Sequence, residues 1–373
     1  MLCGVLLALA GCGGSGIHNF ASYGTGAGEL REPVGIASDW RSGDVYVVDT
    51  NNWRIDKFTA AGRFLLAWGW GVSDGKTRAP QTCYRRCFAG VQGAGAGQFQ
   101  FPEGVAVDED PASSSFRDVY VVDIYNRRVE KFTPGGRFVL MFGGAVNKTT
   151  HAEQEQASED VCPIRPGDVC GAGVEGPGRG QLELAVEGSF IAVGEGGVVW
   201  VGQRDSVKAF SEDGTYLRQV WLAPKAKREG GNEAGGVSGL AINRAGDLYV
   251  IRHGISGVNE YTPSGRLLRT LEQGEAPAYD EGPSPTVTLD PHGDAFVDVY
   301  AHEVHRIDEY TPDGVKIASF DRGPKAPPQI ADKEDGLPGM AYDPKARQLY
   351  LVNADINLRP KVARIRGIES PGP

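Results

Sequence analysis

The sequence predicts an all-β fold, a six-bladed β-propeller built from four-stranded antiparallel blades. The first observation is internal repetition, because one stretch near the N-terminus recurs almost unchanged and weaker copies follow it along the chain. The second is that each copy holds short apolar stretches separated by turn residues, which is typical of propeller blades. The third is the length of 373 residues, which suits a closed repeat array.

The clearest repeat lies in the first two copies. VYVVDTNNWRIDKFT at residues 45–59 aligns without a gap with VYVVDIYNRRVEKFT at residues 119–133. Weaker second strands follow at residues 198–201, 248–251, 296–300 and 349–352. Third strands lead into glycines, which supply the positive φ of tight hairpin turns, at Gly62, Gly136, Gly214, Gly265 and Gly314.

The two ends of the chain predict how the propeller closes. The last copy supplies only three strands and ends near residue 365, whereas residues 20–24 resemble a fourth strand that lacks its first three. We expect this N-terminal strand to complete the C-terminal blade. Such closure would remove the exposed sheet edges of an open array.

The repeat resembles the NHL family. The resemblance is carried by P-x-G-[IV]-A, the Y-V-V-D strand ending, N-x-R-[IV] and the K-F-T-x-x-G turn. It is strong in the first two copies and partial in the other four, and together they cover nearly everything after the N-terminal signal. The resemblance implies a propeller scaffold and names no ligand.

The N-terminus predicts export. Residues 1–12 are apolar but too short to span a bilayer, and LAGC at residues 9–12 resembles the lipobox of bacterial lipoproteins. That resemblance implies a signal at 1–12, a lipid on Cys12 and a mature propeller at 13–373, on the cell surface or in the periplasm. The chain lacks the basic residues that usually precede a lipobox, so an ordinary secretory signal and a buried strand stay as alternatives.

The net charge of the chain disfavours some classes of binding partner. The formal net charge of -10 opposes binding to nucleic acid and to anionic lipid headgroups, because both are polyanions. We therefore expect no nucleic-acid partner, and contact with a membrane only through the N-terminal lipid.

Four cysteines lie in two long insertions, at about 71–97 and 144–180. We expect disulfides within each insertion, Cys83 with Cys87 and Cys162 with Cys170, because the oxidising environment outside the cytosol converts such cysteine pairs to disulfides. A zinc site spanning both insertions is the alternative, although the spacing matches no common zinc module.

The candidate binding face is the rim that carries both insertions. Asp49 and Asn52 recur as Asp123 and Asn126 in the turn after the second strand, on the same side as the insertions. These four residues are candidate ligand-binding groups, since loops on a rigid scaffold carry function. Their recurrence in successive blades favours a structural role in the turn.

Residues that break the repeat symmetry lie just before each first strand. At this channel mouth the series includes Glu103 and Glu187 in adjacent blades, which could bind a hard cation or share a proton. The arrangement resembles gluconolactonase-type propellers, which hold a catalytic divalent metal at the axis. Solvated glutamates at the rim are the alternative, and we expect no cofactor, with calcium or zinc as the alternative.

Other chemical motifs are weak. His253, His302 and His305 resemble the zinc-binding histidines of peptidyl-amidating lyases, but they fall in irregular turns. The glycine-rich stretches at 93–97 and 176–180 have no following helix to receive a phosphate, and no G-x-S-x-G motif occurs. We identify no catalytic residue from the sequence.

The sequence therefore favours a non-catalytic, extracytoplasmic binding scaffold for a protein or glycan on the insertion-bearing face. The alternative is a metal-dependent hydrolase or lyase of the gluconolactonase-like or peptidyl-amidating-lyase-like propeller type.

Overall fold

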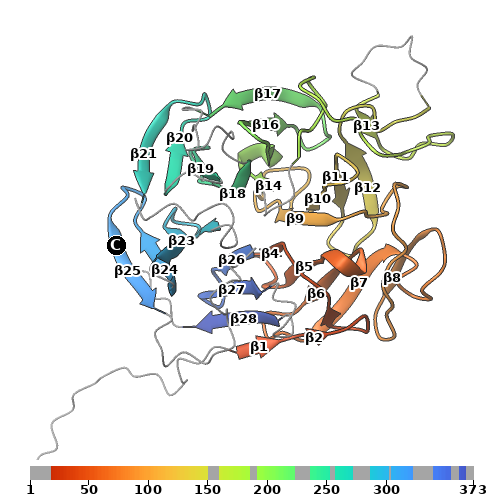
Figure 1. The fold of residues 1–373 in the computed structure, drawn as a ribbon, viewed down its shortest axis with the longest axis horizontal. Coiled ribbons are helices and arrows are strands. Elements are labelled where there is room, and N and C mark those ends of the chain that lie inside the picture. The colour runs from red at the N-terminus through yellow and green to blue at the C-terminus, as the bar shows by residue number, and fades with distance from the viewer. Residues whose placement is uncertain are drawn as a thin grey trace, which may run out of the picture.

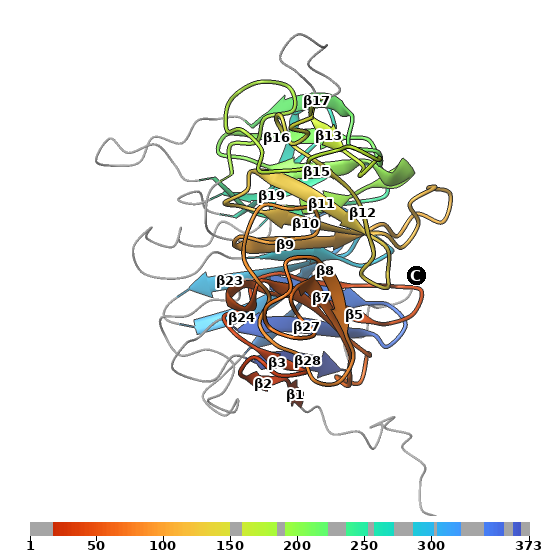
Figure 2. The same cartoon turned by 90° about the vertical axis from the view of Figure 1, so that its right-hand side faces the viewer.

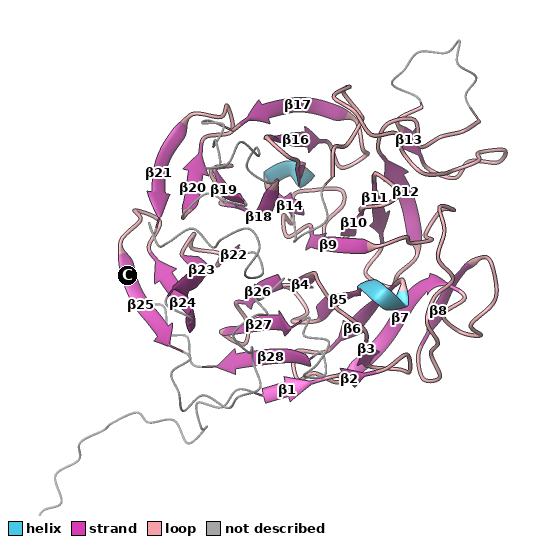
Figure 3. Ribbon diagram, viewed as in Figure 1, coloured by secondary structure: helices cyan, strands magenta, loops and turns pink. Residues whose placement is uncertain are grey.

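The computed structural model describes residues 18–149, 159–184, 191–222, 236–252, 257–271, 286–301, 304–321, 339–353 and 361–366. Within these ranges the regular structure is almost entirely β-strand, and the helices are two short 3-10 turns, η1 (Thr50–Asn52) and η2 (Glu195–Gly197). The sheets are arranged radially around a central axis (Figure 1), and strands dominate the architecture (Figure 3). The protein is an all-β propeller.

Five antiparallel sheets of the described chain are formed by consecutive strands, with the first strand nearest the axis. The first two sheets comprise β4 (Ile36–Ser38), β5 (Val45–Asp49), β6 (Arg54–Phe58), β7 (Phe64–Trp70) and β8 (Pro80–Cys83), then β9 (Pro102–Val107), β10 (Val119–Asp123), β11 (Arg128–Phe132), β12 (Phe138–Phe142) and β13 (Val161–Cys162). The next three comprise β14 (Ile191–Val193), β15 (Val199–Gly202), β16 (Ser206–Phe210) and β17 (Tyr216–Trp221), then β18 (Val237–Ile242), β19 (Leu248–Arg252), β20 (Val258–Tyr261) and β21 (Leu267–Leu271), then β22 (Val287–Leu289), β23 (Ala295–Ala301), β24 (Val304–Tyr310) and β25 (Lys316–Asp321). In the perpendicular view, β9 and β10 run across the thickness of the molecule (Figure 2).

The remaining four-stranded sheet combines both ends of the chain. It consists of β26 (Gly339–Asp343), β27 (Gln348–Asn353), β28 (Lys361–Arg366) and β1 (His18–Phe20), and β1 pairs antiparallel with β28. The innermost strands β4, β9, β14, β18, β22 and β26 contact one another in a ring that returns to β4. The radial array is therefore closed by the N-terminal strand.

The expectation of a propeller of six four-stranded blades is wrong. Five blades of the described chain are made of consecutive strands, and two of these five have five strands because β8 and β13 add to their outer edges. Both added strands come from the disulfide-bearing insertions. The closing strand also lies slightly earlier than expected, since β2 (Ser22–Tyr23) pairs with β3 (Glu29–Leu30) in a separate parallel sheet.

The second and third strands of each well-described blade are buried along their whole length. Every residue of β5, β6, β10 and β11 is buried, because neighbouring blades cover both faces of each sheet. This explains the continuous apolar stretches in the sequence, where a sheet with one wet face would alternate. Buried aromatic rings fill the space between blades, such as Trp68 against Phe132 with centroids 5.7 Å apart.

The hairpin glycines also set the distance between blades. Gly136 has φ +79°, and a Cβ there would lie 2.7 Å from the Trp68 ring of the preceding blade. Both the left-handed conformation and the close approach therefore require glycine at this position.

Candidate functional site

The turn after the second strand is tightly bonded in the first blade. Asp49 accepts hydrogen bonds from the Arg31 backbone N–H at 2.6 Å and from the Asn52 side-chain amide at 2.7 Å. The Asn52 amide also donates to the Gly24 carbonyl at 2.8 Å. Asp49 and Asn52 are fully buried, so both side chains hold the turn against the preceding connection.

The second blade repeats the arrangement. Asp123 accepts from the Gln100 backbone N–H at 3.0 Å and from the Asn126 amide at 2.6 Å, and Asn126 donates to the Gly93 carbonyl at 2.8 Å. Burial raises the pKa of Asp123 to about 6, while the nearby Arg128 lowers it. The contacts are those expected of the structural role, and ligand binding by Asp49, Asn52, Asp123 and Asn126 stays a prediction.

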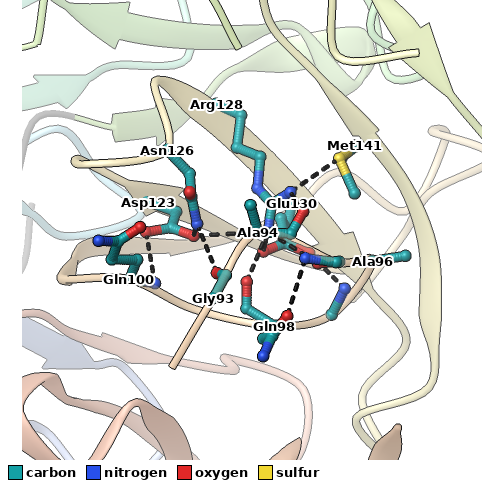
Figure 4. A network of polar contacts seen from close by, with 12 residues as sticks. Gly93, Ala94, Ala96, Gln98, Gln100, Asp123, Asn126, Arg128, Glu130 and Met141 are labelled. Carbon is teal, nitrogen blue, oxygen red and sulfur yellow. Dashed lines mark hydrogen bonds and ion pairs between the residues drawn. The ribbon is translucent and has the colours of Figure 1, made fainter. Parts of the chain in front are cut away.

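Buried arginines join these turns to the inter-blade connections (Figure 4). Arg128 donates to the Glu130 carboxylate at 2.8 Å, to the Gly95 carbonyl at 2.9 Å and to the Gly171 carbonyl at 3.1 Å. Gly95 belongs to a glycine-rich stretch whose carbonyls point at the guanidinium, and Gly171 belongs to the second insertion. The glycine-rich stretch is therefore a structural connection, as the absence of a following helix predicted.

The predicted axial carboxylates are only partly described. Glu103 lies in β9 and is buried, and its carbonyl packs so closely on Gly35 that a Cβ there would lie 2.1 Å away. Glu187 lies outside the described residues, as do Cys12 and the side chains of His253, His302 and His305. Cation binding by Glu103 and Glu187 stays a prediction.

Metal-binding side chains do not gather in the described part of the chain. Among the residues of the described ranges, no three His, Cys, Asp or Glu side chains lie close enough together to hold a metal ion. A resident divalent cation needs several such donors. The His, Cys, Asp and Glu side chains of the described residues therefore do not fit a divalent cation, and the reaction proposed below does not use a metal ion.

Both insertions carry the expected disulfides. Cys83 is bonded to Cys87 with a Cα–Cα distance of 5.5 Å, and Cys162 to Cys170 at 5.7 Å. The prediction of pairing within each insertion is confirmed, and these four thiols cannot form the alternative zinc site. Disulfides indicate an oxidising, extracytoplasmic location. No helix in the described ranges is long and apolar enough to cross a membrane.

A small cavity occupies the axis. Residues of all the innermost strands line it, and its volume is about 160 Å³. Most lining residues have apolar side chains, but polar atoms contribute about half of the lining surface, and Ser38, Glu109, Thr286 and Thr288 are among the polar members. A ring about the size of benzene fits an apolar cavity of roughly 150 Å³.

Glu109 stands where this cavity meets a second pocket of about 140 Å³. The second pocket lies at the mouth beyond the C-terminal ends of the innermost strands, away from the insertions, and Asn243, Arg244 and Asp290 also line it. The Trp40 backbone N–H donates to Glu109 Oε1 at 3.0 Å and orients the carboxyl group.

The environment of Glu109 favours its neutral form. Burial raises the pKa of Glu109 to about 8, the Trp40 N–H opposes that shift, and the carboxylates of Asp39 and Asp108 reinforce it. Arg117 offsets little of this effect, because its guanidinium is bonded to Asp39 at 2.6 Å. A carboxyl group with such a pKa exchanges protons near neutral pH.

The sequence reasoning missed this mouth. The symmetry-breaking positions identified from the sequence lie before the first strands, whereas the residues of the mouth lie one or two positions after these strands end. There the blades place Trp40, Glu109, Glu195, Arg244, Pro291 and Pro344. Alignment of the blades at the C-terminal ends of their first strands also identifies these charged side chains.

Comparisons with known proteins agree on the scaffold. Residues 30–58 match the model of the NHL repeat, which confirms that part of the predicted resemblance. No curated protein matches the chain.

Solved structures share the fold at low identity. A streptogramin B lyase superposes with TM-score 0.51 and 12% identity, covering 94% of this chain and 98% of the lyase. A candidate gluconolactonase gives 0.52 and 13%, covering 96% and 95%. A luciferin-regenerating enzyme gives 0.50 and 15%, covering 95% and 96%. At these identities the similarity establishes the propeller fold.

Proposed function

We propose that the protein is a hydrolase that cleaves a small ester or lactone at the mouth lined by Trp40 and Glu109. The observation that carries the proposal is the position of Glu109, a half-buried carboxyl group at the junction of two pockets. The fold neighbours include a lyase and a candidate gluconolactonase, which supports an enzyme over the non-catalytic scaffold.

Glu109 acts as the general base. A water proton moves to the carboxylate as the water oxygen attacks the substrate carbonyl carbon. The ester C–O bond then breaks, and the proton passes to the leaving alkoxide. The raised pKa makes Glu109 a stronger base than an ordinary glutamate, whose pKa is about 4.3.

The cavity and the mouth limit the substrate. A ring-sized part of the substrate enters the axial cavity, and Arg244, which is exposed at the mouth, attracts an anionic substituent. This proposal keeps the hydrolase alternative that the sequence predicted, but the proposed reaction does not use a metal ion.

The test is hydrolysis of a panel of small lactones and aryl esters by the purified chain. Glu109→Gln should lower kcat/KM by about 10²- to 10⁴-fold, the usual contribution of a general base. In the unmodified chain kcat/KM should rise about tenfold per pH unit below pH 8 and level off above it, because only the carboxylate accepts the proton.

Glu175→Gln is the matched control, because Glu175 pairs with Arg127 on the insertion-bearing face and should leave kcat/KM unchanged. Full activity in Glu109→Gln would rule out the proposed base. Activity lost on chelation and restored by calcium or zinc would instead support the metal-dependent alternative.

The lipid anchor on Cys12, and contact with a membrane through it, are also proposals. The lipid on Cys12 would place the β1 end of the propeller near a membrane and the insertions away from it. Mass spectrometry of the N-terminal peptide tests this, since an unmodified Cys12 in protein from an exporting host would contradict it.

A further inference from the structure

The first insertion concentrates positive charge on an acidic protein. We call residues 71–88 the basic loop, because four basic residues lie there with one acidic residue, while the whole chain carries a net charge of -10. The acidic residue, Asp74, is engaged within its own turn and accepts from the Lys76 and Thr77 backbone N–H groups at 3.0 and 2.9 Å. The basic residues are Lys76, Arg78, Arg85 and Arg86.

These cations are available to a partner. All four residues are exposed, and within the described ranges none of their side chains forms an ion pair with a carboxylate. Arg127 and Arg269, by contrast, are paired with Glu175 and Glu260. The exposed hairpin residues Arg63 and Arg137 have no ion pair within the described ranges but stand singly, away from other basic residues in the sequence. The charge of the basic loop is therefore not neutralised by its described surroundings.

The base of the loop is rigid. The Cys83–Cys87 disulfide closes a short ring whose two cysteines are buried. Arg54 donates to the Phe88 carbonyl at 3.0 Å, and the Phe88 N–H donates to the Val72 carbonyl at 2.9 Å. The exposed side chains between the cysteines are thus presented on a fixed backbone, which lowers the entropy lost on binding.

Two aromatic rings accompany the charges. Tyr84 is 63% exposed and Phe88 is 46% exposed, although burial of such rings is normally favourable. A Cβ at Gly75 would lie 3.5 Å from the Phe88 ring, so the segment that carries Lys76 lies against this aromatic side chain. Ring faces and cations therefore occur together on the loop.

We propose that the basic loop binds an acidic polysaccharide. Arginine forks match carboxylate or sulfate groups, exposed ring faces can pack on the apolar faces of sugar rings, and clusters of basic residues are typical of sites for anionic glycans. A stable protein interface uses about 20–30 residues on each partner, whereas the basic loop spans residues 71–88 only, which disfavours an acidic protein. Disulfides place the loop outside the cytoplasm, where such polymers occur.

Binding of polygalacturonate, a linear polymer of uronic acid, tests the proposal by calorimetry at several salt concentrations. The full chain should bind it, with affinity falling as salt rises, and should not bind uncharged dextran. Arg85→Gln/Arg86→Gln should weaken binding by about 2- to 30-fold, since each exposed ionic contact contributes about 0.2–1 kcal/mol. Tyr84→Ser should weaken binding without changing its salt dependence.

The matched control is Arg63→Gln/Arg137→Gln, which removes the same charge from two exposed hairpin turns and should leave the affinity unchanged. Equal loss in both double variants would show non-specific attraction and overturn the proposal. Absence of polygalacturonate binding would also overturn it, and so would preference for anionic vesicles, for single-stranded RNA or for an acidic protein over polygalacturonate. Hydrolysis by the Glu109 mouth should be unaffected by the Arg85/Arg86 substitutions, so the two proposals fail separately.

Discussion

Arg127 and Arg128 are neighbours in the sequence but differ completely in their surroundings. Arg128 is fully buried and donates to carbonyls of two different loops as well as to Glu130. Arg127 reaches the surface and pairs with Glu175 at 3.0 Å. The N-x-R-[IV] motif places this arginine in the repeat, but the motif could not give the number of segments that its guanidinium holds together.

Replacing Arg128 should therefore be costly. Arg128→Met leaves Asp123 and Glu130 buried without their positive charge, and we expect a loss of about 3–5 kcal/mol in the free energy of unfolding. Arg127→Met is the matched control and should cost no more than about 1 kcal/mol, because exposed ion pairs contribute little. Urea denaturation measures both, and similar losses would contradict the assigned roles.

At the scale of elements, each long insertion adds one strand to the outer edge of its blade. β13 pairs with β12 through Met141 and Cys162, and Cys162 is fully buried beside Met141 and Val146. The cysteine pairing was predictable from spacing and compartment. The added strand was not, because two residues give no usable alternation and only the free edge of β12 makes them a strand.

The second disulfide should stabilise the native state measurably. Cys162→Ala/Cys170→Ala should lower the free energy of unfolding by about 2–3 kcal/mol, since the cross-link restricts the unfolded chain and the loop it closes is short. Reduction should shift the urea midpoint of the unmodified protein further than that of Cys162→Ala/Cys170→Ala, because the variant has only the Cys83–Cys87 disulfide left to lose. An unaltered midpoint in the variant would show that the insertion is held by its hydrogen bonds alone.

At the scale of the whole molecule, β1 joins the two ends of the chain. Besides pairing with β28, it places Phe20 against Phe58 of the first blade at 5.2 Å and against Tyr350 of the last sheet at 6.3 Å. One strand therefore links the beginning and the end of the ring, and closure makes the stability of the blades interdependent.

Deletion of residues 17–23 should destabilise the entire propeller. The loss of the β1–β28 pairing and of the Phe20 ring should cost at least about 3 kcal/mol and lower the thermal midpoint of the complete transition. Phe20→Ala, which keeps the strand, should give a smaller shift. Circular dichroism during heating measures these midpoints, and an unchanged midpoint in the deletion variant would contradict closure by β1.

The sequence by itself determined the propeller, the NHL-like repeat, the closing role of the N-terminal segment and the cysteine pairs. These follow from local patterns, because strand periodicity, glycine turns and short cysteine spacings act over a few residues. Only the tertiary structure decided the fifth strands and the mouth where Trp40, Glu109 and Arg244 line connected pockets. Those residues lie in different blades, and closure of the ring brings them together, so their proximity and the raised pKa of Glu109 depend on the complete fold.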